Sequence, residues 1–305
     1  MSIISHHLNK KLYLGDIYRV QAQNTDMIQQ FLDMERPVVI KGLIDTWPAR
    51  ILWTLDYLEK VCNNSNVNYV PLDANNRTAY KKISNMPFSE FFRSLKDILC
   101  NEHHYNKYKK LYLTVTRIMT HPNRDAPQLP QLLKDIEVPN FIPIKRLWSI
   151  NLWLGAGGNT SYLHFDPDQN ILTVLKGSKK FILFPPSEAK LLYQNTSKNT
   201  NRLMSSVDIF DNIDTTKYPK IFMAKYYEVE IKEGESIYIP PGWWHAVVSS
   251  KDLNLAVNFW WLVKPVCLLK FSRVSSRQLW RIKNKWLCIL FPTWISKYIK
   301  PKIGI

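Results

Sequence analysis

The sequence has 305 residues, of which 46% are hydrophobic and 22% charged, so it can bury a core and is neither disordered nor collagen-like. Its net charge of +16 and pI of about 9.6 favour an acidic or polyanionic partner, although an A/T-rich genome would give the same lysine-rich composition. The longest apolar run, residues 286–295, is interrupted by Pro292 and is far shorter than the ~20 residues that cross a bilayer. The first residues lack the features of a secretory signal, so we expect an intracellular protein, cytoplasmic or nuclear, without a transmembrane span.

The first part of the chain alternates between helical and extended patterns. Residues 26–35 have apolar side chains at helical spacing, and residues 37–42 read as a short buried strand that ends at a glycine. Residues 53–61 and 87–99 predict two further helices, the first capped by Thr54 and the second with a proline in its first turn. Each helix should bury one face.

From residue 147 to residue 263 the pattern changes to short β-branched and aromatic segments, separated by turn residues. A polar insertion over residues 187–225, with a short helix at 188–193, is expected as a loop over the mouth of a pocket. The fold class is therefore mainly β with flanking helices and a jelly-roll core. The eight predicted strands are 148–154, 161–166, 170–175, 180–184, 226–231, 236–239, 245–249 and 253–261.

The last 42 residues form a separate region by charge. Residues 264–305 contain ten Lys or Arg and no Asp or Glu, so we divide the chain into a domain over residues 1–263 and a basic, partly helical tail. Three interpretations of the tail remain open. It packs as helices on the domain or at a homodimer interface, it binds nucleic acid such as tRNA, or it lies on a membrane surface as an interfacial helix.

Two histidines and an aspartate form the candidate metal site. His164 and Asp166 are two residues apart on a predicted strand, so both side chains point to one face. A rigid Pro-Pro-Gly turn follows strand 236–239 and fixes the direction of His245. Two imidazoles and one carboxylate make the facial triad of non-haem Fe(II) oxygenases, which leaves three positions open for O2 and a chelating 2-oxoacid. Zinc is the rival metal, but it more often takes four N/S ligands, or three His or His2Glu when it is catalytic.

Several separated motifs resemble one known family in the same order. The stretches RPVVIKGLIDTWPA (36–49), SYLHFDPDQNILTVLKGSKKFILFPP (161–186), IYIPPGWWHAV (237–247) and LAVNFWW (255–261) are similar to the JmjC branch of the cupin-fold Fe(II)/2-oxoglutarate dioxygenases. The resemblance covers about residues 10–263. Within the family it is strongest to the small hydroxylases, which include the asparaginyl hydroxylase acting on hypoxia-inducible factor and the tRNA wybutosine hydroxylase. It implies a double-stranded β-helix, the cupin or JmjC core.

The resemblance also implies roles for individual residues. The family's iron ligands fall on His164, Asp166 and His245, and its cosubstrate lysine falls on Lys179. Lys176 and Lys180 are alternatives for that lysine, but Lys180 should point away from Lys179 because neighbours on a strand alternate. A buried cation has a physical reason here, since a dicarboxylate that enters an apolar barrel needs a counter-charge. Other cosubstrate contacts carried over from the family are Tyr112, Ser161, Asn170 and Asn258.

The activity that the resemblance implies is hydroxylation of a macromolecular substrate, most simply a protein side chain. The cofactor would be Fe(II), the cosubstrates 2-oxoglutarate and O2, and the products succinate and CO2. Many histone demethylases of the family have Glu where this chain has Asp166, and they carry extra modules, so hydroxylation is favoured over demethylation. Two alternatives stay open. One is hydroxylation of a tRNA base, and the other is a non-enzymatic nucleic-acid-binding cupin with a structural metal.

Overall fold

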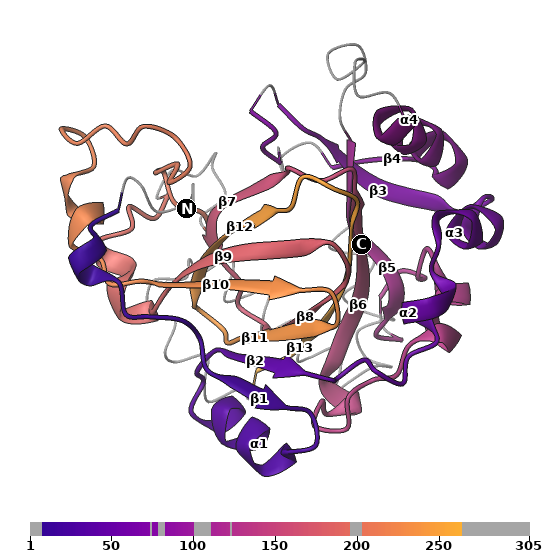
Figure 1. Cartoon of the computed structure of the whole chain (residues 1–305), viewed down its shortest axis with the longest axis horizontal. Helices are drawn as coiled ribbons and strands as arrows, with labels where there is room; N and C mark the ends of the chain where they lie inside the picture. Colours follow the sequence, from indigo (N-terminus) through magenta and orange to yellow (C-terminus); the bar gives the residue numbers. More distant parts are fainter. Residues whose placement is uncertain are drawn as a thin grey trace, which may run out of the picture.

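The computed structural model describes residues 8–73, 75–78, 83–100, 111–122, 124–195 and 203–263. In this part of the chain two β-sheets face each other, and helices pack on the larger one (Figure 1). The larger sheet has the strand order β1-β2-β11-β8-β13-β6-β5-β3-β4, and the smaller has the order β10-β9-β12-β7. The strands of the larger sheet are β1 (Arg19–Gln21), β2 (Val38–Lys41), β3 (Asn66–Pro71), β4 (Ser84–Pro87), β5 (Leu111–Thr120), β6 (Leu147–Gly155), β8 (Gln169–Lys176), β11 (Glu235–Ile239) and β13 (Asn254–Trp261). The strands of the smaller sheet are β7 (Thr160–Phe165), β9 (Ser178–Phe184), β10 (Tyr227–Lys232) and β12 (Trp244–Ser249).

The core of the fold is formed by the eight strands from β6 to β13, which confirms the predicted double-stranded β-helix. Strands β6, β8, β11 and β13 lie in the larger sheet and β7, β9, β10 and β12 in the smaller one. Every pair among them is antiparallel. Each predicted strand matches an observed one to within two residues, because the turns between them contain strong turn formers.

The chain before β6 widens the larger sheet on both sides. Strand β2 confirms the strand expected over residues 37–42, and it pairs with β1 in parallel and with β11 antiparallel. On the other side β5 pairs with β6, β3 with β5 and β4 with β3. Strand β5 has no counterpart among the predicted elements, although it carries Tyr112.

The helices cover the outer face of the larger sheet. The three predicted helices are confirmed as α1 (Thr25–Asp33), α3 (Leu55–Cys62) and α4 (Phe88–Cys100), with a short α2 (Ala49–Leu52) before α3. As expected, the Thr54 side chain caps α3 by accepting from the backbone N–H of Tyr57 at 3.2 Å. Pro87 differs from expectation, because it is the last residue of β4 and not part of α4. The face of α4 that is buried in the core comprises Phe88, Phe91, Phe92, Leu95 and Ile98.

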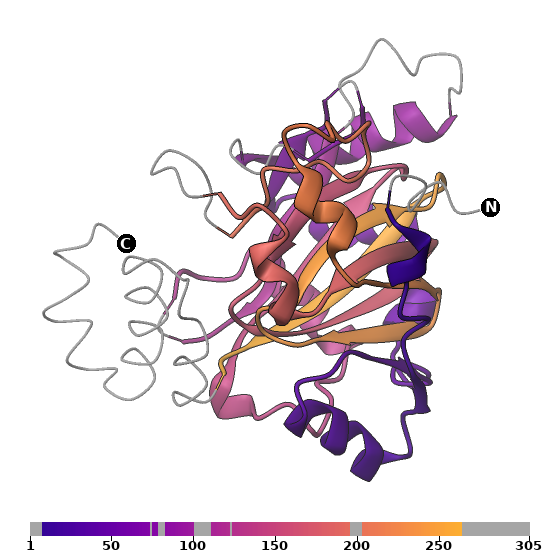
Figure 2. The same ribbon diagram turned by 90° about the vertical axis from the view of Figure 1, so that its left-hand side faces the viewer.

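The described part of the insertion over residues 187–225 is packed on the smaller sheet, and its expected position over the pocket mouth stays a prediction. Its described part packs a second apolar core against the outer face of the smaller sheet, and in Figure 2 it lies in front of the strands. It also continues the edge of β7, where the N–H of Phe165 donates to Leu203 O at 3.0 Å and the N–H of Ser205 to Leu163 O at 2.8 Å. The expected helix at 188–193 is a 3₁₀ turn at Pro186–Lys190. The buried side chains that the insertion contributes are Leu192, Val207, Ile209, Ile213 and Ile221.

Residues 264–305 lie outside the described residues, so the structure tests none of the three interpretations of the basic tail. The division of the chain at residue 263 therefore stays a prediction. Within the described ranges, no helix combines the length and apolar character needed to cross a membrane.

Candidate metal centre and adjoining pocket

A pocket between the two sheets contains all eight side chains that the sequence assigns to the site. It is lined from both sheets, so residues far apart in the chain meet there. Their convergence is a structural finding, whereas their roles stay predictions. The lining residues are Tyr112, Trp153, Asn159, Ser161, His164, Asp166, Asn170, Leu172, Lys179, Phe181, Ile239, His245, Val247, Asn258 and Trp260.

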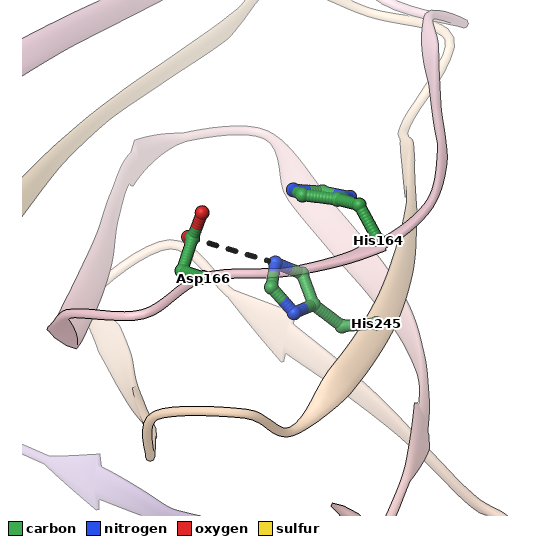
Figure 3. A group of neighbouring side chains, drawn as sticks. All are labelled: His164, Asp166 and His245. Carbon is green, nitrogen blue, oxygen red and sulfur yellow. Dashed lines mark ion pairs between the residues drawn. The ribbon is translucent and has the colours of Figure 1, made fainter. Parts of the chain in front are cut away.

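Three potential metal ligands meet in this pocket (Figure 3). His164, Asp166 and His245 each offer one ligand atom, and these atoms all lie within 4.8 Å of one another. The two imidazole rings are 4.3 Å apart between centroids. Among the described residues this is the one group of three or more His, Cys, Asp or Glu that could hold a metal ion. Two imidazoles with one carboxylate are the donor set that suits Fe(II) with open coordination positions.

Backbone carbonyls select the tautomer of both histidines. Nδ1 of His164 lies 2.7 Å from the carbonyl oxygen of Tyr162, and Nδ1 of His245 lies 3.0 Å from that of Trp243. A carbonyl oxygen can only accept, so each Nδ1 carries the hydrogen. Each Nε2 then carries the lone pair that can bind a metal ion, and the same bonds fix the orientation of the rings.

Strand pairing and one glycine turn bring the two halves of the triad together. His164 on β7 lies directly opposite His245 on β12 in the antiparallel register, so both side chains point to one face. The backbone N–H of Gly242, in the predicted Pro-Pro-Gly turn, donates to the carbonyl oxygen of Asp166 at 2.9 Å. Gly242 has a φ of 79°, which a side chain with a Cβ rarely adopts. The turn that leads into His245 is thus attached to the residue that supplies the carboxylate.

The imidazole of His245 is neutral at physiological pH. Burial, and after it the neighbouring His164, lower its pKa to about 3, although the hydrogen bond to Trp243 acts in the opposite direction. Its Nε2 lies 4.0 Å from Oδ2 of Asp166, the separation marked in Figure 3. Because the ring is neutral, this separation is the spacing of two ligand atoms and not a salt bridge. A neutral imidazole is the form that binds a metal ion.

Lys179 is a buried cation in the same pocket. Only 3% of the residue is exposed, and its Nζ donates to Ser249 Oγ at 2.8 Å and to Tyr112 Oη at 3.4 Å. Burial lowers the pKa of its ammonium group to about 7, and among the described residues no carboxylate offsets that effect. The described part of the chain thus surrounds Lys179 with neutral partners, a costly arrangement unless a ligand brings an opposite charge.

The two lysines next to Lys179 are oriented differently. Lys180 follows it on β9 and forms an exposed pair with Glu230 at 3.8 Å. Lys176 pairs with Glu233 at 2.9 Å at the end of β8. Neither lines the pocket. The alternation along β9 therefore places Lys179, and not its neighbours, in the pocket.

Tyr112 reaches Lys179 because the facing residue has no side chain. In the register of β5 and β6, Tyr112 lies opposite Gly155, and a Cβ at Gly155 would come within 2.8 Å of the tyrosine ring. Gly155 is a residue of the site that the sequence-based predictions miss. A single glycine in a strand indicates that another group approaches closely, and that signal could have found it.

Ser161 enters the pocket through an irregularity in β7. It is three residues before His164, and regular alternation would point the two side chains to opposite faces. The register shifts between His245 and Val247, so that three steps along β7 match two steps along β12. This bulge turns Ser161 to the same side as His164, where both line the pocket. Alternation alone could not have shown this.

Ser249 and two tryptophans complete the surroundings without having been predicted as contacts. Ser249 lies four residues after His245 on β12 and therefore shares its face, which strand periodicity could have indicated. Trp153 and Trp260 line the pocket with their rings at 87° and their centroids 6.2 Å apart.

Comparison with known proteins identifies the class of fold to which this site belongs. The cupin-like domain family matches residues 24–265, and the chain belongs to that family. Some similar proteins carry JmjC names, such as the Jumonji C domain-containing protein 5 of Drosophila melanogaster, which is 28% identical over 260 residues, 81% of this chain and 60% of the relative. The predicted resemblance to JmjC proteins is thereby confirmed.

Two further relatives differ in what their names describe. The lysine-specific demethylase JMJ30 of Arabidopsis thaliana is 35% identical over 228 residues, which cover 74% of this chain and 49% of the relative. The human tRNA wybutosine-synthesizing protein 5 is 28% identical over 251 residues, which cover 80% of this chain and 76% of the relative. The chain thus spans about half the length of the demethylase and most of the tRNA-modifying protein.

Proposed function

We propose that this chain is an Fe(II)- and 2-oxoglutarate-dependent oxygenase that hydroxylates a protein side chain and releases succinate and CO2. The observation that carries the proposal is one pocket that holds both a two-histidine, one-aspartate triad and a buried lysine without a carboxylate partner among the described residues. The triad suits Fe(II), and the lysine suits the distal carboxylate of a dicarboxylic 2-oxoacid.

The residues of the chain divide the work between holding and orienting. His164, Asp166 and His245 would hold the metal, the two histidines through Nε2 because each Nδ1 donates to a backbone carbonyl. Lys179, supported by Tyr112, would anchor the cosubstrate at its far end. Bound Fe(II) would supply the chemistry, namely O2 activation coupled to oxidative decarboxylation of 2-oxoglutarate.

Hydroxylation, rather than demethylation, is the outcome we propose. Both reactions begin with hydroxylation of a carbon, and a methyl group is lost only when that carbon is bonded to nitrogen. Asp166 at the carboxylate position supports a hydroxylase, because many demethylases of the family have Glu there.

A second candidate is hydroxylation of a modified tRNA base. Its support is the match to tRNA wybutosine-synthesizing protein 5, which extends over 76% of that protein, together with the net charge of +16. A non-enzymatic binding module is a weaker candidate, because a structural metal gives no reason to bury Lys179 without a carboxylate among the described residues.

The test of the oxygenase site is 2-oxoglutarate binding to the anaerobic, Fe(II)-loaded protein, followed by the visible charge-transfer band of the chelate. We expect the band in the wild type and its loss in His164→Ala and Asp166→Ala. Lys179→Ala should also weaken it strongly, and the matched control Lys180→Ala, on the other face of β9, should not. A wild type without bound iron or band would refute the proposal.

The substrate is tested separately. Purified protein fractions and tRNA are each incubated with the wild type and with His164→Ala, and the products are compared by mass spectrometry for the gain of one oxygen atom. Oxygen gained only in protein supports the first candidate. Oxygen gained only in tRNA replaces it with the second.

A further inference from the structure

Asn258 is the centre of a hydrogen-bonded group of side chains on three adjacent strands. It is fully buried on β13, between Asn151 on β6 and Asn170 on β8. Its Oδ1 accepts from Nε1 of Trp153 at 2.8 Å and from Nδ2 of Asn151 at 3.1 Å. Its own Nδ2 donates to Oδ1 of Asn170 at 2.9 Å. Both ends of the Asn258 amide are therefore engaged within the protein.

The chemistry of the indole fixes the direction of these bonds. An indole N–H can only donate, so the atom of Asn258 that faces Trp153 has to be the carbonyl oxygen. The other end of the amide, which faces Asn170, is then the NH2 group. The atom of Asn170 that receives this donor is in turn its carbonyl oxygen. One donor-only residue thus sets the orientation of two amides that would otherwise be interchangeable.

The direction of the bonds determines what Asn170 offers to a ligand. Asn170 lines the pocket with the metal triad, and its carbonyl oxygen is engaged by Asn258. The group left to face the pocket is its NH2, which can only donate. Asn258 also contributes to the pocket wall, but its oxygen already accepts two hydrogen bonds and its NH2 already donates one to Asn170. The two asparagines, which the family resemblance treats alike, therefore differ in the hydrogen bonds that they make within the protein.

We propose that Asn258 is a positioning residue that holds the Asn170 amide with its NH2 toward the pocket, where that group donates to an acceptor oxygen of the bound 2-oxoacid. The inference rests on the proposed function. If Asn258 is replaced by a residue without an amide, Asn170 can turn over and present its carbonyl oxygen to the anionic ligand, which replaces an attraction by a repulsion.

A double-mutant cycle tests this role. The affinity of the Mn(II)-loaded protein for 2-oxoglutarate is measured by calorimetry in the wild type, Asn258→Leu, Asn170→Ala and the double variant, without turnover. We expect each single variant to bind about tenfold more weakly, the effect of one hydrogen bond to a charged oxygen. When Asn170 is already alanine, the further change Asn258→Leu should weaken 2-oxoglutarate binding by less than about twofold, because its effect passes through Asn170.

A matched control separates positioning from general loss of stability. Asn254 lies on the same strand, is 1% exposed and donates from Nδ2 to Ser178 O at 2.8 Å, but it does not line the pocket. Asn254→Leu should lower the melting temperature without a comparable loss of affinity. If Asn258→Leu fails to fold, Asn258→Ser, which is too short to reach Asn170, takes its place.

The outcomes distinguish the two levels of the proposal. If the two losses of 2-oxoglutarate binding free energy were additive in the double variant, the role of Asn258 would be overturned and the proposed function would stay intact. An equal loss of affinity in Asn254→Leu would do the same, because it would show a general effect of buried amides. A wild type that does not bind 2-oxoglutarate would overturn the proposed function and the role of Asn258 with it.

Discussion

Replacing Lys179 by methionine should stabilise the ligand-free protein while it abolishes 2-oxoglutarate binding. Burial lowers the pKa of Lys179 from 10.5 to about 7, and this difference corresponds to about 5 kcal/mol against the charged form. Methionine fills a similar volume without the charge. Ser249 and Tyr112 each lose a hydrogen-bond donor, and each loss destabilises the folded protein by about 1 kcal/mol. We therefore expect the free energy of unfolding to rise by a net ~3 kcal/mol near pH 6.

The gain should depend on pH in a defined direction. Below pH ~7 the lysine is protonated in both the folded and the unfolded wild type, so the folded state bears the full penalty. Between pH ~7 and ~10.5 Lys179 keeps its proton in the unfolded state but has lost it in the folded state. The free energy of unfolding of the wild type therefore rises by about 1.4 kcal/mol per pH unit in this range. The advantage of Lys179→Met should therefore shrink as the pH rises, vanish at about pH 9 and reverse above that pH.

Urea unfolding of the metal-free proteins at about pH 6 and about pH 9.5 measures both effects. Calorimetry with the Mn(II)-loaded proteins measures the accompanying loss of 2-oxoglutarate affinity. If Lys179→Met were no more stable than the wild type at the lower pH, burial of the ammonium group would not carry the expected penalty. A gain that did not change with pH would point to improved packing instead of charge removal.

Three further predictions concern the same pocket and its surroundings. Wild-type affinity for 2-oxoglutarate should fall by up to about tenfold per pH unit above pH ~7, because binding then requires Lys179 to take up a proton; calorimetry at several pH values measures it, and a flat profile would contradict it. Gly155→Ala should displace the Tyr112 ring, destabilise the protein by about 1–3 kcal/mol and weaken 2-oxoglutarate binding; unchanged unfolding and binding would show that the ring can move freely. Arg77→Leu should cost about 2 kcal/mol, because it removes the largely buried pair with Asp208 at 2.9 Å. It should also make the insertion more sensitive to limited proteolysis, and an unchanged digestion pattern would exclude a role for Arg77 in holding it.

The barrel can be predicted from sequence because its signals are local. Turn residues separate the eight strands, and alternation correctly places His164 and Lys179 on inward faces. Strand β5 (Leu111–Thr120) is missing from the predicted elements because it lies before the region of residues 147–263 in which turn residues separate the strands. The family resemblance predicts the position of Ser161, whereas its physical cause is a bulge that only strand pairing reveals.

The roles within the site depend on contacts that no local pattern encodes. Asn170 and Asn258 look equivalent in the sequence. The indole of Trp153, which can only donate, fixes the amide of Asn258, and Asn258 in turn orients the amide of Asn170. The packing of the insertion escapes prediction for a similar reason. Its apolar residues are widely spaced among polar ones, so their common face appears only once the smaller sheet is formed beneath them.

The packing of that insertion limits how far the protein can be reduced in size. The inward face of the smaller sheet lines the pocket with Lys179 and His245, and its outward face carries Ile182, Phe184 and Trp244 into the second core. A shortened protein without residues 187–225 would expose these outward side chains as one apolar surface, which promotes self-association. A minimal barrel would therefore need new polar residues on the backs of the strands that carry the site.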